Sequence, residues 1–325
     1  MTAKKDLRAK GADKSSAPEK GKFAIRCISG TGIILLTLGI IFGGHLALTA
    51  FGEYWQSSFF AGKWPFVIFV AFLAAVAVFE WSRMILKKQK TPLFIVHAIL
   101  AALAIVATGL GHTPTFMPVL VLGLSIFIYM NAGFRGVREN KDKLAGGFFY
   151  ILFLLSFLVI LAGYIGRFVP GPLGDERLIA IEPLHLKIAI AALFVTVWAS
   201  DSMAYVFGRF IGGPKLAPSI SPKKTWAGLV GSMTGAGGAL ILTAYIFLHQ
   251  FDPVFKFPPL YSFFLYGAFL GIVGQIGDLT VSVFKRSHNM KDTGALIPGH
   301  GGVLDRIDAL MLITPFYYLG FIQLF

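Results

Sequence analysis

The sequence predicts an all-α integral membrane protein, a polytopic helical chain with about nine transmembrane helices. Hydrophobic residues make up 56% of its 325 residues and charged residues only 14%, whereas soluble domains contain about 25% charged residues. The apolar residues also fall in runs of about twenty, the length at which a helix spans a bilayer. These two observations exclude a soluble globular class.

Three regions can be distinguished along the chain. Residues 1–26 are polar and contain eight Lys or Arg, so they cannot bury enough apolar surface to fold and are predicted to form a disordered basic tail. Residues 27–180 are expected to hold about five N-terminal spans, and residues 181–325 contain three charged motifs. No small-residue cleavage site follows a short apolar core, so we expect an uncleaved first span. The predicted spans are 28–51, 64–82, 92–111, 115–134, 148–168, 186–208, 226–248, 261–284 and 303–325.

Basic residues are distributed unevenly between the two predicted sides of the membrane. If the N-terminal tail is cytoplasmic, 24 of the 29 Lys and Arg fall in the tail or in the connections after the second, fourth, sixth and eighth spans. The other side retains Lys63, Arg167, Arg177, Lys187 and Lys256. Excess Lys and Arg in short cytoplasmic loops is the positive-inside rule. Topology and contact with anionic headgroups therefore explain the formal net charge of +13, without nucleic acid.

Asp201 is the first candidate functional residue, within the apolar span 186–208. It precedes Arg209 by about two helical turns, or roughly 12 Å, which places it near the headgroup boundary. A carboxylate there is costly unless it is paired, binds a metal ion or faces a water-filled cavity. We therefore expect Asp201 to belong to a functional site, and a structural pair with a neighbouring base is the alternative.

The segment PSISPKKTWAG forms the second motif on the same predicted side. Ser221 before Pro222 is typical of a helix N-cap with proline at the first helical position. The exposed amides of such a helix, beside Lys223 and Lys224, would attract phosphate. The alternative is that these are ordinary positive-inside lysines before the next span.

The third motif places carboxylates, a hydroxyl and an ammonium group close together. On a helix, Asp278, Ser282 and Lys285 lie at i, i+4 and i+7 and share one face, as do Asp305 and Asp308 at i and i+3. The glycines of PGHGG between them allow close approach of backbone amides to a ligand. Mg²⁺ is usually bound by one or two carboxylates together with phosphate oxygens and water. A magnesium–phosphate site is therefore indicated, and structural ion pairs with neighbouring bases are the alternative.

Zinc and disulfide chemistry are not indicated. Cys27 is the only cysteine, which excludes an intramolecular disulfide and a cysteine metal cage. The chain has no HExxH spacing beside its histidines. We expect His300 to donate a hydrogen bond to phosphate or to pack the loop.

Residues 282–308 resemble the signature of the phosphatidate cytidylyltransferases, also called CDP-diacylglycerol synthases. That pattern is S-x-x-K-R, four further residues, K-D, and later H-G-G-x-x-D-R-x-D. Similar segments are SPKKTW, Asp201 with the following AY and G, and GDL, so the resemblance covers roughly residues 195–308. Ala227 and Val281 stand where members of the family often have Glu. These two differences bear on the preference among substrates rather than on the reaction. Every fixed position is present: Ser282, Lys285, Arg286, Lys291, Asp292, His300, Gly301, Gly302, Asp305, Arg306 and Asp308.

The resemblance implies transfer of CMP from CTP to phosphatidate, which gives CDP-diacylglycerol and pyrophosphate in phospholipid biosynthesis. It makes residues 181–325 the catalytic region, at the cytoplasmic face of a bacterial-type inner membrane. It also implies Mg²⁺ and a homodimer, and it leaves open a second metal ion and a monovalent cation such as K⁺.

The resemblance also assigns roles to individual residues. The implied catalytic residues are Asp278, Ser282, Lys285 and Asp305, and the implied metal ligands are Asp278, Asp305 and Asp308. The implied substrate-binding residues, for the phosphates of CTP and phosphatidate, are Asp201, Ser221, Lys223, Lys224, Arg286, Lys291, His300, Gly301, Gly302 and Arg306.

Two other functions are considered from the sequence. A secondary transporter for an anionic metabolite would also need many spans and basic residues. Transporters tend to contain internal repeats and binding residues near the midplane, whereas this chain has no evident repeat and its ionisable residues cluster at one face. A CTP-dependent lipid kinase or another nucleotidyl transferase of lipid phosphates is disfavoured by the signature.

Overall fold

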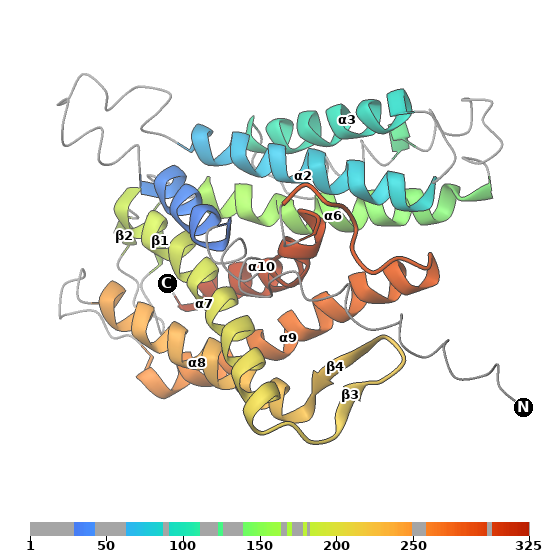
Figure 1. Cartoon of the computed structure of the whole chain (residues 1–325). Coiled ribbons are helices and arrows are strands. Elements are labelled where there is room, and N and C mark those ends of the chain that lie inside the picture. The colour runs from blue at the N-terminus through green and yellow to red at the C-terminus, as the bar shows by residue number, and fades with distance from the viewer. Residues whose placement is uncertain are drawn as a thin grey trace, which may run out of the picture.

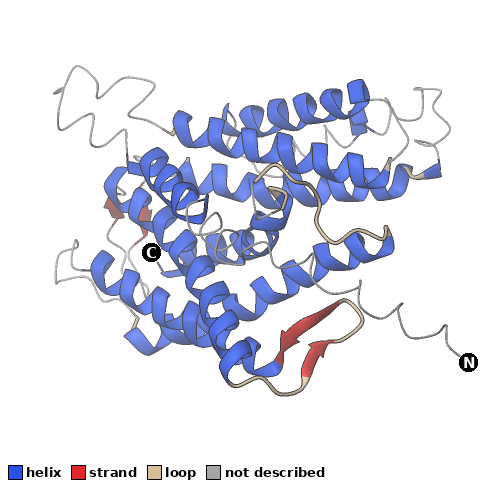
Figure 2. Ribbon diagram, in the orientation of Figure 1, coloured by secondary structure: helices blue, strands red, loops and turns tan. Residues whose placement is uncertain are grey.

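In the part of the chain that the structure describes, the protein is a bundle of long helices with two short pairs of antiparallel strands (Figures 1 and 2). The computed structural model describes residues 29–42, 63–86, 91–110, 123–125, 139–163, 168–170, 178–180, 183–248, 258–297 and 301–324. A helix at Ser29–Phe42 precedes the labelled helices. These are α2 (Trp64–Ile85), α3 (Thr91–Leu110), α6 (Lys141–Ala162), α7 (Pro183–Phe210), α8 (Trp226–Leu248), α9 (Leu260–Ser287) and α10 (Leu304–Leu324).

The predicted all-α, multi-span class is confirmed. In the part of the chain that the structure describes, six helices are long and apolar enough to cross a membrane: α2, Leu93–Leu110 of α3, α6, Leu186–Phe210 of α7, Trp226–Ile246 of α8, and α9. The ninth predicted span coincides with α10. Most of the fourth, and the second half of the first, lie outside the described residues, so the count of nine stays a prediction, as does the division at residue 180.

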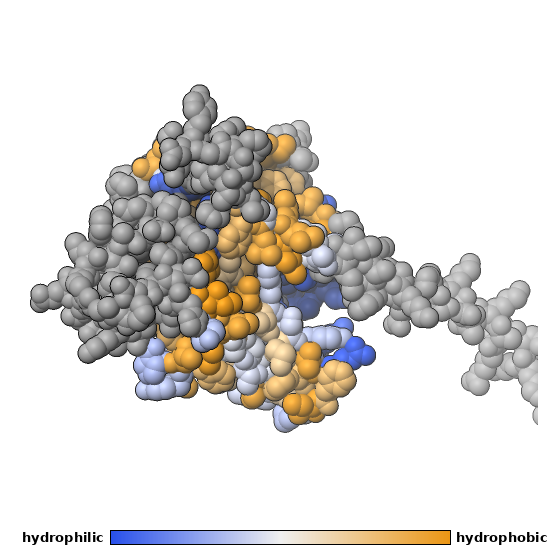
Figure 3. All heavy atoms as spheres, turned by 90° about the vertical axis from the view of Figure 1, so that its left-hand side faces the viewer, coloured by the Kyte–Doolittle hydropathy of each residue, from blue (hydrophilic) through white to orange (hydrophobic). Residues whose placement is uncertain are grey.

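The helices form two groups that α10 joins. α2, α3 and α6 pack against one another, and α8 packs between α7 and α9. α10 contacts both α6 and α9 (Figure 1). Hydrophobic residues cover most of the described surface in Figure 3, and outward-facing side chains such as Phe72, Leu103 and Leu265 are more than half exposed. This is the surface expected where lipid surrounds the helices.

Trp81 links three helices near the end of α2. Its indole Nε1 donates a hydrogen bond to the carbonyl of Lys143 on α6 (3.1 Å), and its ring packs edge-on against Phe284 of α9, with centroids 4.8 Å apart. Gly147 of α6 lies directly against the indole, because a Cβ there would be 1.8 Å from the ring. The end of α2 is therefore fixed against both helix groups.

Small residues bring α7, α8 and α9 into close contact. The hydroxyl groups of Ser200 and Ser232 lie 2.6 Å apart, and Ser232 donates to the carbonyl of Gly271 at 2.9 Å. Close backbone approach and interhelical hydrogen bonds replace the hydrophobic effect as the main source of helix association in lipid. The three helices that surround the charged motifs are thus held together inside the membrane region.

The expected helix N-cap at Ser221 is wrong. Ser221–Thr225 forms strand β4, which pairs antiparallel with β3 (Lys215–Ala217). Helix α8 begins only after this hairpin, and the hydroxyl of Thr225 caps it by accepting a hydrogen bond from the amide of Gly228 (3.0 Å). Pairing with β3 gives the backbone of residues 221–225 an extended conformation, so Pro222 does not start a helix.

Two smaller differences concern the fifth predicted span. α6 begins at Lys141 rather than near 148, because its first turn is charged but still helical. Phe168–Pro170 forms strand β1, which pairs with β2 (Leu178–Ala180) instead of continuing a helix.

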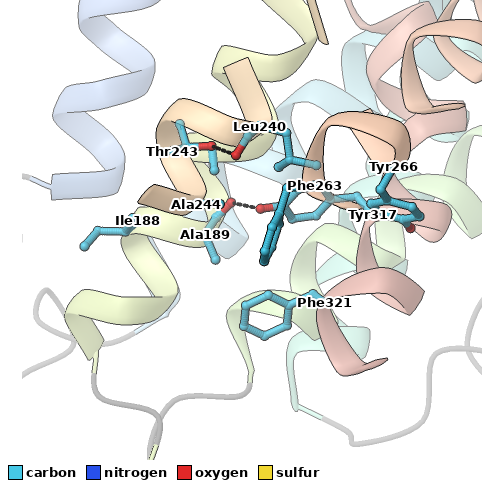
Figure 4. A pocket seen from close by; sticks show the side chains of 10 residues that line it. Ile188, Ala189, Leu240, Thr243, Ala244, Phe263, Tyr266, Tyr317 and Phe321 are labelled. Atoms are coloured by element: carbon cyan, nitrogen blue, oxygen red, sulfur yellow. Dashed lines mark hydrogen bonds between the residues drawn. The ribbon is translucent and has the colours of Figure 1, made fainter. Parts of the chain in front are cut away.

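A small apolar cavity lies between α7, α8, α9 and α10 (Figure 4). It is lined by side chains such as Phe263, Tyr317 and Phe321, and its volume is about 40 Å³. Tyr317 donates its hydroxyl hydrogen to the carbonyl of Ala189 (2.7 Å). This volume is far below the roughly 300–1,000 Å³ of small-molecule sites, so the cavity cannot hold a nucleotide.

The helix contact at Gly271 can be tested by adding a side chain. A Cβ at this position would lie 2.7 Å from the carbonyl oxygen of Ser232, so Gly271→Val forces α8 and α9 apart and costs about 1–3 kcal/mol, as overpacked cores do. Thermal unfolding of the detergent-solubilised protein should shift to lower temperature. Gly238→Val is the matched control, because a Cβ at Gly238 meets nothing within 4 Å. Equal stability of the two variants would contradict the close packing.

Candidate active site

A large cavity lies where the ends of α7, α9 and α10 meet the β3–β4 hairpin. Its volume is about 470 Å³, within the roughly 300–1,000 Å³ of small-molecule sites. It brings together residues from all three charged motifs of the sequence. Those that line it are Asp201, Lys223, Lys224, Asp278, Lys285, Asp305, Arg306 and Asp308.

The cavity wall combines opposite charges in equal number. Its bases are Arg209, Lys223, Lys224, Lys285 and Arg306, and its carboxylates are Asp201, Asp278, Asp292, Asp305 and Asp308. Arg and Lys are suited to phosphate oxygens, and carboxylates to hard divalent cations. The wall is therefore suited to a polyphosphate that arrives with a metal ion.

The predicted common face of α9 is confirmed at Asp278. One carboxylate oxygen accepts a hydrogen bond from Ser282, one turn later, at 3.1 Å. The other pairs with the ammonium group of Lys224 at 2.8 Å, and Lys224 also donates to the carbonyl of Gln275 at 3.4 Å. The ion pair ties the hairpin to α9 and places its lysine inside the cavity.

Asp305 is held by four donors at the start of α10. Oδ1 pairs with the ammonium group of Lys285 at 2.7 Å, and both side chains are less than 10% exposed. Oδ2 accepts from the amide and the hydroxyl of Thr293 (2.8 and 3.1 Å) and from the amide of Gly302 (3.1 Å). A carboxylate with several hydrogen bonds at a helix N-terminus is strongly stabilised. In this arrangement Asp305 organises the loop between α9 and α10.

Glu80 of α2 fixes the same loop from the other helix group. It is 4% exposed, and its two oxygens accept hydrogen bonds from the amides of Val303 (3.0 Å) and Leu304 (2.9 Å). The single hydroxyl hydrogen of Thr293 is shared between Oε2 of Glu80 (2.9 Å) and Oδ2 of Asp305 (3.1 Å). Thr293 therefore bridges Glu80 and Asp305, and a side chain more than 200 residues away caps α10.

The two glycines of the HGG segment are required by this packing. Gly301 has φ +85°, a conformation that favours glycine. A Cβ on Gly302 would lie 2.2 Å from the hydroxyl of Thr293 and 2.4 Å from a carboxylate oxygen of Glu80. The amide of Gly302 is used by Asp305, so it binds the protein rather than a ligand in this structure.

Asp201, Asp278 and Asp308 come from three different helices and line the same cavity. Asp308 is 7% exposed, and its carboxylate accepts a hydrogen bond from the amide of Ala309 (2.8 Å). In the described part of the chain, however, no three His, Cys, Asp or Glu side chains form a cluster that could hold a metal ion unaided. These carboxylates fit a cation that completes its coordination with substrate phosphates and water, as Mg²⁺ does.

Several residues singled out from the sequence do not line the cavity. Ser221 and Ser282 are near it, but Ser282 is 6% exposed and its hydroxyl is used by Asp278. Lys291 is exposed, and His300 lies outside the described residues.

Arg286 has a structural contact instead. Its Nε donates to the carbonyl of Ile220 in the hairpin turn, and its Nη1 donates to the carbonyl of Met290, both at 3.0 Å. It thereby connects the hairpin to the loop that follows α9.

Comparison with known proteins agrees with the signature. A sequence model described as the cytidylyltransferase family matches residues 54–325, which is most of the chain. The chain belongs to the cytidylyltransferase family. It is similar to the phosphatidate cytidylyltransferase of Bacillus subtilis (strain 168), with 31% identity over 271 residues, 79% of this chain and 88% of that protein.

Other relatives match a shorter part. The phosphatidate cytidylyltransferase of Rickettsia bellii (strain RML369-C) is 37% identical over 168 residues, 52% of this chain and 68% of that protein. That of Rickettsia typhi (strain ATCC VR-144 / Wilmington) is 39% identical over 132 residues, 41% of this chain and 58% of that protein. The resemblance drawn from the signature is confirmed, and the chain is a nucleotidyltransferase.

Sequence reasoning missed three features of this cytidylyltransferase. Tyr205 and Arg209 follow Asp201 at i+4 and i+8 and line the cavity with it, so helical spacing would have found them. Arg209 donates to the Tyr205 hydroxyl at 2.6 Å. Glu80 could have been found by the argument that selected Asp201, because it too is a carboxylate within an apolar span.

The Glu80 contact predicts a loss of both stability and activity in Glu80→Gln. The amide nitrogen of Gln would face a donor, since both carboxylate oxygens accept hydrogen bonds. Leaving a buried donor unpaired costs about 1–3 kcal/mol of folding stability. A comparable loss of transition-state stabilisation at the displaced site lowers the rate of cytidylyl transfer about tenfold or more. Thermal unfolding and turnover of the purified variant measure the two effects.

Asp142→Asn is the control for Glu80→Gln, because Asp142 is an exposed carboxylate in the first turn of α6. It should leave both quantities unchanged. Wild-type stability and turnover in Glu80→Gln would show that the carboxylate does not hold the loop.

Proposed function

We propose that this cytidylyltransferase transfers CMP from CTP to phosphatidate, releasing pyrophosphate and forming CDP-diacylglycerol. The observation that supports this best is the cavity in which five bases and five carboxylates meet at one end of a bundle of apolar helices. Such a site can hold the polar groups of a nucleotide and a lipid phosphate while the acyl chains remain in the membrane. The names of the relatives support the same reaction.

In the proposed reaction an oxygen of the phosphatidate phosphate forms a bond to the α-phosphorus of CTP. The bond from that phosphorus to the bridging oxygen breaks, and pyrophosphate leaves with the electron pair. Both reactants are anions, so the protein has to neutralise charge and align them, with little covalent chemistry of its own.

The bases of the cavity divide into two sets. Lys224 and Lys285 are held in ion pairs with carboxylates. Arg209, Lys223 and Arg306 also line the cavity, and none of them forms an ion pair with a described carboxylate. We propose that these three bases bind the phosphates of the incoming substrates. The two paired lysines hold the carboxylates in place and contact phosphate once a substrate is bound.

Ser282 is proposed to orient Asp278 rather than to attack the substrate. Its side chain is 6% exposed, and its hydroxyl donates to the Asp278 carboxylate. Phosphatidate provides its own nucleophilic oxygen, so no covalent intermediate on the serine is needed. A single displacement at the α-phosphorus follows from this arrangement.

Mg²⁺ is the proposed cofactor, and Asp278 and Asp308 are the proposed ligands. When bound, it would supply positive charge that offsets the negative charge of the substrate phosphates. Asp278 would have to exchange its contact with Lys224 or Ser282 for the metal. Asp305 was also predicted as a ligand, and its oxygens accept from Lys285, Thr293 and Gly302, so it would have to make the same kind of exchange. A second metal ion and a monovalent cation such as K⁺ remain part of the proposal.

The orientation is proposed from the charge distribution. Of the 29 Lys and Arg, 24 fall on the side that contains the cavity motifs, and the positive-inside rule assigns this side to the cytoplasm. CTP and pyrophosphate are then on the correct side of a bacterial inner membrane. A homodimer that binds no nucleic acid is the proposed form of the protein.

Substitutions of the aspartates test the reaction and the metal assignment together. Purified protein incubated with CTP, phosphatidate and Mg²⁺ should form CDP-diacylglycerol and pyrophosphate. Asp278→Asn keeps the shape of the side chain and an acceptor for Ser282 but removes the charge and the ion pair with Lys224. Because the Asp278 side chain is 35% exposed, that pair contributes little to stability. The variant should therefore fold normally and lose at least about 100-fold in turnover, the scale of a lost transition-state contact. Raising Mg²⁺ should restore part of that loss.

Asp305→Asn should behave differently. It breaks the buried pair with Lys285, and breaking such a pair costs about 3–5 kcal/mol, so thermal stability without nucleotide should fall together with activity. Asp142→Asn again serves as the exposed control. Absence of CDP-diacylglycerol from the wild-type reaction would contradict the proposed function, and substantial activity of Asp278→Asn at ordinary Mg²⁺ would contradict the ligand assignment.

A further inference from the structure

A second cavity opens between α2 and α3, and only Gly294–Leu296 of its lining belong to the 282–308 signature. Its volume is about 610 Å³, and its walls are almost entirely apolar. Phe72 and Val76 of α2 and Ile95 and Ile99 of α3 form its sides, and the segment Gly294–Leu296 closes one end. α2 and α3 lie side by side on the outside of the bundle (Figure 1). We call this cavity the α2–α3 groove.

The groove has the dimensions of one leaflet. From Phe72 to Arg83, the first and last of its α2 residues, a helix rises by roughly 16 Å at 1.5 Å per residue. This is about half of the approximately 30 Å hydrocarbon core of a bilayer. An occupant that reaches from the charged end of α2 to the other end of the groove therefore has the length of an acyl chain in one leaflet.

Arg83 gives the groove one charged end. Its side chain is exposed, and it forms no ion pair with a carboxylate among the described residues. Glu80, one turn earlier on α2, is not available to it, because both Glu80 oxygens accept hydrogen bonds from the α9–α10 loop. A guanidinium group at the end of an apolar groove in the membrane complements a phosphate that is covalently attached to an acyl chain.

The groove is separate from the active-site cavity. Glu80 and Gly294 line the groove, Asp292 and Asp305 line the active-site cavity, and the buried Thr293 lies between them, bonded to Glu80 and Asp305. A molecule in the groove would therefore contact the back of the active-site loop and not the reacting atoms.

We propose that the α2–α3 groove binds an anionic phospholipid that is not a substrate. One acyl chain lies between α2 and α3, and the lipid phosphate contacts Arg83. The lipid packs against Gly294–Leu296, directly after Thr293, and so supports the loop in the position that holds Asp305. The bound lipid is a structural component of the site rather than a reactant.

Photolabelling tests this inference without CTP and therefore independently of the proposed reaction. The full-length protein is placed in phosphatidylcholine nanodiscs that contain a small fraction of phosphatidylglycerol with a photoactivatable group on its acyl chain. After irradiation, labelled peptides are identified by mass spectrometry. We expect labelling to concentrate on α2, α3 and residues 294–297, and to exceed that by a phosphatidylcholine probe about fivefold, the equivalent of about 1 kcal/mol per basic residue.

Substitutions test separately the binding of the acyl chain and the binding of the headgroup. Ala98→Trp places a ring in the groove and should remove the labelling of α2 and α3; Ala102→Trp does the same if the first variant is unstable. Arg83→Gln should lower phosphatidylglycerol labelling to the phosphatidylcholine level, and Arg83→Lys should retain most of it. Lys141→Gln, at an exposed base at the start of α6, should have no effect.

Equal labelling of the groove by the two probes in the wild-type protein would overturn the proposal, since it would mean ordinary annular lipid only. Unchanged labelling in a correctly folded Ala98→Trp or Ala102→Trp variant would overturn it as well.

Discussion

The site depends on one buried carboxylate. Glu80 belongs to the first helix group, yet its three hydrogen bonds go to the loop between α9 and α10 and to the first amide of α10. Burying an ionised carboxylate is costly unless it is fully hydrogen-bonded, so the loop and Glu80 stabilise each other only in this arrangement. Glu80 of α2 caps the first turn of α10. This contact therefore fixes the positions of Asp305 and Asp308, which lie in the first turns of that helix. The two helix groups are thereby joined at the point where chemistry is proposed to occur.

The rest of the structure supplies apolar surroundings for a very polar site. α7, α8 and α9 approach closely through Ser200, Ser232 and Gly271, so the three helices present their polar ends to one cavity. Two pairs of opposite charges in the cavity wall form ion pairs, Lys224 with Asp278 and Lys285 with Asp305. These pairs hold the two carboxylates in position near the membrane, where an unpaired charge is costly. A nucleotide with its metal ion can then enter a site whose charges are already balanced.

Much of this could be predicted from the sequence, and the exceptions have physical reasons. Long apolar runs predicted the spans, and helical spacing predicted the contact between Asp278 and Ser282, because both signals are local. The N-cap expected at Ser221 failed because β3 pairs with residues 221–225, an interaction that local propensity does not include. The bridge from Glu80 through Thr293 to Asp305 joins residues more than 200 positions apart, and a single sequence does not reveal such a contact. The glycines of the HGG segment were expected to let backbone amides approach a ligand. The same long-range contact instead explains why a larger side chain does not fit there.

The central claim is that the active-site loop is preformed by this bridge before any substrate binds. Hydrogen exchange followed by mass spectrometry, on the wild-type protein in nanodiscs without CTP or Mg²⁺, tests it directly. The amides of Thr293, Gly302, Val303 and Leu304 all donate to carboxylates of Asp305 or Glu80, so they should exchange as slowly as the interior amides of α9. Exchange at the rate of an open loop, with protection only after CTP is added, would contradict the account.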